Sequence, residues 1–174
     1  MNFKNLLTFL ILILIYPNFI KADEKIVFID IKHLMNNSLA GKSINDQLTE
    51  QNKIINNNFK KKENDLKTEE STIIAQKNVL DENQYDNKIK LFKTKVLKYN
   101  QNKKDANNEI KKKQINARSS LINSLNKILS EYTKSNSISI IISKEDVVLG
   151  KSELDITNYV LQELDSKIKK IIIK

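Results

Sequence analysis

Residues 39–134 are the part of this sequence that most limits its fold. The stretch contains no proline and a single glycine, and apolar residues recur in it at spacings of three, four and seven. In its second half the apolar positions alternate in steps of four and three through Tyr85, Ile89, Phe92, Val96 and Tyr99. This is the heptad pattern of helices that pack along one apolar seam, so the sequence predicts very long helices here.

The two halves of this stretch also match each other in reverse order. Residues that face one another in an antiparallel hairpin have numbers that add to a constant, and here the constant is 165. The matching pairs include Leu80 with Tyr85, Ile73 with Phe92, Leu66 with Tyr99, Phe59 with Ala106, Ile55 with Ile110, Leu48 with Ala117 and Ile44 with Leu121. We therefore predict a hairpin arm with its tip near residues 81–84, where Asp81 and Gln84 can form a capping box. One continuous helix in a parallel coiled coil is the alternative.

The segments on either side of the arm have a different character. Residues 25–31 and 137–143 are rich in β-branched residues, as strands are, and residues 147–149 suggest a third strand linked to the second by a hairpin. A short helical turn is expected around His33, and Asp155 is placed to cap a last helix. The predicted fold class is α+β: a small β-rich body made of residues 23–38 and 135–174, carrying the helical arm at 39–134.

This body is too small to hold two long helices without further support. A body of about 60 residues buries a small core, so we expect it to associate with other copies through its strands. The apolar strand residues expected to form that contact are Ile26, Phe28, Ile138, Ile140 and Ile142.

The N-terminal residues 1–22 have the organisation of a secretory signal peptide. A lysine at position 4 precedes the apolar run of residues 6–15, and Pro17 interrupts the run before a cleavage site placed after Ala22. The sequence therefore predicts an exported protein. An uncleaved N-terminus would instead give a membrane-tethered structural coiled coil of the cell envelope, which remains the alternative function.

Positive charge is concentrated on the second half of the arm. Residues 85–134 carry 13 basic side chains against 4 acidic ones, whereas residues 39–80 carry 7 against 6. A basic rod attracts nucleic acid, anionic lipid or lipopolysaccharide, and acidic protein segments. Export makes nucleic acid the poorest of these partners, so none is expected, and a nucleic-acid-binding hairpin is kept only as a rival interpretation. The candidate contact residues are Lys88, Lys90, Lys95, Lys98, Lys111 and Lys112.

The sequence contains no arrangement typical of an active site. It has no cysteine and one histidine, His33, to which no role is assigned. No carboxylate pair, glycine-rich phosphate loop or nucleophile motif stands out, so neither an enzyme activity nor a cofactor is expected.

Several elements together resemble the Skp or OmpH-like family of periplasmic chaperones. They are the strand ending in residues 27–30, the Ser38–Lys42 segment that opens a long charged helix, the strand at 138–142, and the Leu154–Thr157 segment after it. The resemblance covers nearly all of the chain after residue 22, although residues 171–174 extend past the expected end of the family.

The resemblance implies a homotrimer with three helical arms around a cavity. Such proteins bind unfolded outer-membrane β-barrel proteins after export and keep them soluble without ATP. By this resemblance the strands near residues 26–31 and 138–142 would form the trimeric body.

Overall fold

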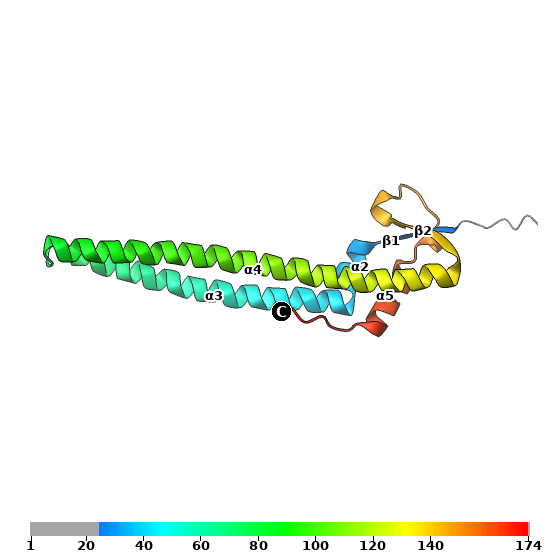
Figure 1. The fold of residues 1–174 in the computed structure, drawn as a ribbon, viewed down its shortest axis with the longest axis horizontal. Coiled ribbons are helices and arrows are strands. Elements are labelled where there is room, and N and C mark those ends of the chain that lie inside the picture. Colours follow the sequence, from blue (N-terminus) through cyan, green and yellow to red (C-terminus); the bar gives the residue numbers. More distant parts are fainter. Residues whose placement is uncertain (1–24, 174) are drawn as a thin grey trace, which may run out of the picture.

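The computed structural model describes residues 25–173, which form a long helical arm and a small body at its base (Figure 1). The predicted signal peptide at residues 1–22 lies outside the described residues. In chain order the elements are β1 Lys25–Ile29, α2 Ile31–Asn37, α3 Leu39–Ala75, α4 Glu82–Asn136, β2 Ile138–Ser143, the 3-10 helices η1 Lys144–Asp146 and η2 Ser152–Leu154, and α5 Thr157–Lys167. The predicted α+β class with a long helical hairpin is confirmed.

The arm consists of α3 and α4, which lie side by side and run in opposite directions (Figure 1). The two helices have 37 and 55 residues, so at 1.5 Å per residue they are about 55 Å and 80 Å long. The additional length of α4 extends past the start of α3 into the body. Within residues 25–173, no helix is both long enough and apolar enough to cross a membrane.

The turn at the tip lies earlier in the chain than predicted. The first helix ends at Ala75 and the second begins at Glu82, so the connection is 76–81 and not 81–84. The carbonyl of Gln76 accepts hydrogen bonds from the N–H groups of both Val79 and Leu80, each at 3.0 Å, and these short turns replace the last helical turn that the heptads had predicted. The predicted capping residue is right, because Asp81 accepts a 2.9 Å hydrogen bond from the Gln84 N–H.

Contacts between α3 and α4 agree with the predicted register to within one residue near the tip. Lys95 bonds Glu69 and Lys88 bonds Gln76, both at 2.6 Å, and each pair of residue numbers adds to 164. Farther down the arm, Tyr99 makes an edge-to-face contact with Phe59, with ring centroids 5.7 Å apart. The numbers 59 and 99 add to 158, so this contact is shifted by seven residues, or one heptad, from the predicted sum of 165. Two large rings can reach along the seam where the residue predicted opposite Phe59 is only an alanine.

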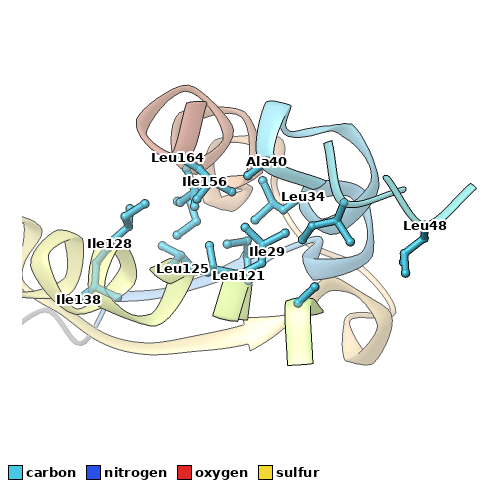
Figure 2. Packing of buried hydrophobic residues seen from close by; sticks show 14 of the residues in the cluster. Ile29, Leu34, Ala40, Leu48, Leu121, Leu125, Ile128, Ile138, Ile156 and Leu164 are labelled. Carbon is cyan, nitrogen blue, oxygen red and sulfur yellow. The ribbon is translucent and has the colours of Figure 1, made fainter. Parts of the chain in front are cut away.

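The body is built on a two-stranded parallel sheet with helices on one face. Its register pairs Ile26 with Ile140 and Phe28 with Ile142. Val27 and Ile29 point to the other face and are almost fully buried. Residues from α2, α4 and α5 pack in the same core, and Figure 2 shows how they converge. The buried helical residues of this core include Leu34, Leu121, Leu125, Ile128, Val160 and Leu164.

The start of α3 lies in close contact with the backbone of α2. A Cβ atom at Gly41 would lie 2.1 Å from the carbonyl oxygen of Met35. The buried Ser38 caps the helix by accepting a 3.1 Å hydrogen bond from the Gly41 N–H. The small residues in the Ser38–Lys42 segment therefore allow the two helices to pack closely.

The segment around Asp155 joins the last helix to the first strand. The Asp30 N–H donates to the Thr157 hydroxyl at 2.9 Å, and the Ile156 N–H donates to the Phe28 carbonyl at 3.0 Å. Asp155 itself accepts from the Thr157 N–H at 2.9 Å and pairs with Lys144 at 2.7 Å. Partial burial raises the pKa of Asp155, but the hydrogen bonds from Lys144 and Thr157 outweigh it and leave this pKa below its usual value.

The third strand predicted at residues 147–149 was wrong. The chain leaves the sheet at Ser143, makes the 3-10 turn Lys144–Asp146, and continues as an irregular loop in which Val148 and Leu149 are fully exposed. The expected hairpin does not form because β2 pairs with β1 in parallel and the chain then turns away from the sheet. The body consequently holds two short strands and more helix than expected.

Residues 168–173 form an extended tail that runs back along α3 (Figure 1). Ile168, Ile171 and Ile173 pack against the core of the body and the base of the arm. The Gln47 side chain bonds the tail backbone at two points, the Ile171 carbonyl at 2.7 Å and the Ile173 N–H at 3.2 Å.

The contact between Gly41 and Met35 predicts a strong response to one added methyl group. Gly41→Ala should lower the free energy of unfolding by about 1–3 kcal/mol, because the new Cβ must displace backbone atoms that cannot move independently. Thermal unfolding followed by circular dichroism measures the effect. Lys42→Ala, at the exposed next position, is the control and should change stability by less than about 0.5 kcal/mol. Equal stability of Gly41→Ala and the parent would contradict the close packing.

The hairpin register predicts which engineered cysteines can cross-link within one chain. The protein has no cysteine of its own, so Ile73→Cys combined with Phe92→Cys should give efficient intramolecular cross-linking. Ile73→Cys with Tyr85→Cys places the second thiol about 10 Å farther along the helix and should react poorly. Mass spectrometry of the monomeric band gives the yields. A higher yield for the second pair would require a different register.

Candidate functional site

The distal half of the arm contains an apolar groove between its two helices. The groove has a volume of about 680 Å³. Its apolar lining comes from both helices and comprises Leu66, Ile73, Ile74, Ile89, Phe92, Val96, Leu97 and Tyr99. A groove of this kind can bind an apolar segment of another molecule.

The groove exists because apolar residues continue beyond the seam. Ile73 and Val96 are seam positions, and each is followed by another large apolar residue, Ile74 and Leu97. These two side chains are 60% and 70% exposed, far more than seam residues. One apolar residue beside the seam on each helix widens the apolar strip, so one flank of the arm is apolar as well as the seam.

The charged residues at the rim of the groove balance one another. Glu63 and Lys67 form an ion pair at 2.9 Å, and Glu70 and Lys93 also line the groove. The hydrogen bond and charge of Lys67 hold the pKa of Glu63 below its usual value. With two acids and two lysines the rim has no net charge at neutral pH, so the groove favours an apolar ligand over a charged one.

The other flank of the seam is polar and its lysines connect the two helices. The Lys95–Glu69 and Lys88–Gln76 hydrogen bonds both lie on this flank. Lys98 lines a shallow hollow of about 310 Å³ on the same flank, together with Lys62, Asp65 and Glu69. The arm therefore has an apolar flank and a charged flank on opposite sides of one seam.

The six lysines proposed from the sequence do not form one site. Lys88 and Lys95 are used in bonds between the helices. Lys90, Lys98, Lys111 and Lys112 make no ion pair within residues 25–173. Along α4, about 20 Å separates residue 98 from residue 111, so the lysines form a distributed basic surface.

The five strand residues proposed for association fall into two groups. Phe28 and Ile138 are each only 8% exposed and belong to the interior of a single chain. Ile26 and Ile140 are 43% and 52% exposed and pair with each other across the sheet, with Ile142 half-buried beside them. Within the described residues no strand pairs with the outer edge of β2. The sheet thus presents an exposed apolar pair and an open edge.

The apolar groove was not predicted from the sequence. The heptad pattern assigned one apolar seam to each helix and gave no role to the apolar residues beside it. The doublets Ile73-Ile74 and Val96-Leu97 were the available signal, because each places an apolar side chain just outside the seam. In the observed register these two side chains lie about 10 Å apart along the arm.

Comparisons with known proteins agree with this architecture. Residues 25–164 match the family described as outer membrane protein (OmpH-like). A crystal structure of a candidate outer membrane chaperone (OmpH-like) from Caulobacter crescentus CB15 has the same fold, with a TM-score of 0.81 at 19% sequence identity. The match covers 86% of this chain and 88% of that one. No curated protein matches the chain.

The resemblance seen in the sequence is confirmed by these matches. The segments that carried it, Ser38–Lys42 and Leu154–Thr157, are the ones that hold the helices and strands of the body together. The family match spans both of these segments and the whole arm between them. The chain belongs to the OmpH-like outer membrane protein family.

Proposed function

We propose that this protein is an ATP-independent holdase chaperone of the periplasm. Its clients are unfolded outer-membrane β-barrel proteins, which it binds after export and keeps soluble until they are assembled. The observation that carries the proposal is the division of the arm into an apolar flank and a charged flank along one seam.

The two flanks suit different stages of client binding. An unfolded outer-membrane protein exposes alternating apolar residues and often has a net negative charge. Lysines spread along α4 attract such a chain over a distance and raise its rate of capture, and lipopolysaccharide or other anionic lipid would be attracted in the same way. Many weak apolar contacts then retain the client without fixing its conformation.

The body supports assembly into a trimer. The exposed Ile26–Ile140 pair and the open edge of β2 lie together at the base of the arm. An apolar pair beside an unpaired strand edge is the surface expected for association with another copy of the sheet. Three copies joined in this way would hold three arms around a common space.

Substitutions in the sheet should separate association from folding. Ile140→Asp should dissociate the trimer and leave each chain folded, because this side chain is largely exposed in the single chain. Phe28→Asp buries an unpaired charge and should cost several kcal/mol of folding stability. Multi-angle light scattering and circular dichroism measure the two effects, with Ile115→Asp on the exposed arm surface as a control that changes neither. A stable monomer of the parent protein at micromolar concentration would refute the trimer.

Charge reversal on α4 should slow client capture. Replacing Lys90, Lys98, Lys111 and Lys112 with Glu should lower the rate of capture at low salt by about tenfold and weaken its salt dependence, leaving the trimer intact. Lys88 and Lys95 are left unchanged because they join the helices. A control with the same charge change uses Lys32, Lys127, Lys134 and Lys151, which are exposed near the body.

The chaperone proposal itself is tested by measuring the aggregation of a client. Turbidity of a denatured β-barrel protein diluted from urea should be suppressed by the parent at stoichiometric ratio without nucleotide. Aggregation at an unchanged rate in a threefold excess of trimer would end the proposal. If both charge variants slow capture equally, the net charge of the protein controls the rate and not the lysines along the arm.

A further inference from the structure

The C-terminal tail occupies a place on α3 that recognises polypeptide backbone. The amide of Gln47 donates to the Ile171 carbonyl and accepts from the Ile173 N–H, at 2.7 Å and 3.2 Å. A residue in a parallel sheet bonds its neighbour in the same manner, to the carbonyl and the N–H on either side of the residue opposite. The side chain of Gln47, on the surface of a helix, therefore makes the two hydrogen bonds that one residue of a neighbouring strand would make.

The amide of Gln47 is held ready for this contact. Its nitrogen also lies 2.9 Å from the Ser43 carbonyl and 3.1 Å from the Ser43 hydroxyl, one turn earlier in the helix. These bonds fix the orientation of the amide, so its two polar atoms face the tail in the order that an extended chain requires.

The tail side chains alternate as they do in an amphipathic strand. Ile171 and Ile173 are half-buried and pack against the core cluster, whereas Ile172 is 72% exposed. Hydrogen bonds to the main chain do not select a particular sequence. Selectivity comes from the two half-buried positions, which require an apolar side chain at every second residue. The chemistry recognised here is therefore an extended segment with alternating apolar residues.

Transmembrane β-strands have this same pattern of alternation. The tail also lies beyond the matched family region, which ends at residue 164. We propose that Gln47 and the adjoining surface of α3 form a seat for an extended, alternately apolar polypeptide. The tail is a self-ligand of this seat, and a client segment displaces it. The client half of this inference rests on the proposed chaperone function.

Because the tail belongs to the same chain as Gln47, it has an advantage over a free segment that competes for the same surface. A segment tethered this close to its seat has an effective concentration on the order of millimolar. A free short segment would compete poorly, whereas a client already held by many contacts along the arms can compete. The tail thus selects for long unfolded chains over short peptides, and its removal should strengthen client binding.

Hydrogen exchange of the mature protein tests the seat without any client. Gln47→Ala and Gln47→Met should both speed exchange at the Ile173 amide by about tenfold, since each removes both bonds to the tail. Two variants are used so that one poorly folded protein does not decide the result. Gln51→Ala, one turn farther along α3, is the matched control and should leave exchange in the tail unchanged. Unchanged exchange in both Gln47 variants would overturn the self-ligand.

Adding a denatured β-barrel protein from urea tests displacement. In a soluble complex with the client, exchange in the tail of the parent should rise to the level of the Gln47 variants. A protein truncated after Lys169 should bind the client several-fold more tightly, and Gln47→Ala in that truncated protein should reverse the gain. Persistent protection of the tail in the complex, or equal affinity of the truncated protein, would overturn the competition.

The outcomes distinguish this inference from the proposed function. If no variant binds the client, the chaperone function and the displacement both fail, while the client-free exchange still decides whether the tail is a ligand of Gln47. If the client binds and the tail remains in place, the chaperone function stands and the displacement is refuted.

Discussion

The single apolar seam between α3 and α4 is the interaction on which the rest of the structure depends. It is well buried near the body, where Ile44, Leu48, Ala117 and Leu121 belong to the common core. Toward the tip most seam residues are only half-buried, with Ile73 as an exception. A two-helix arm has no third element to cover its flanks, so its stability falls from the base to the tip. The same lack of cover leaves the apolar groove open to another molecule.

Much of the arm could be predicted from the sequence because its residues obey local rules. Heptad spacing gave the helices, and matching spacings in the two halves gave their antiparallel register to within one residue near the tip. The turn was misplaced by several residues because the pattern of apolar residues continues to Leu80, beyond the end of the helix. The displaced contact between Phe59 and Tyr99 depends on ring size, which a heptad pattern does not describe.

The body was harder to predict because its order depends on contacts between distant residues. Residues 147–149 have the composition of a strand, but β2 already has a partner far back in the chain. Phe28 and Ile138 were expected to face another copy, and their burial within one chain follows from how the loop after β2 and helix α4 fold over the sheet. The positive charge of α4 could be counted from the sequence, whereas the hydrogen bonds that Lys88 and Lys95 make across the arm could not be predicted from it.

The parallel pairing of the two strands has a consequence for the order of folding. Ile26 pairs with Ile140, so the sheet joins positions more than a hundred residues apart, with the whole arm between them. Closing a flexible loop of that length is slow and entropically costly. The helical hairpin removes most of this cost because it brings its own two ends together through contacts between successive layers. Formation of the arm therefore precedes closure of the sheet, and the body is completed only when β2 and α5, which follow the arm in the chain, pack against β1 and α2.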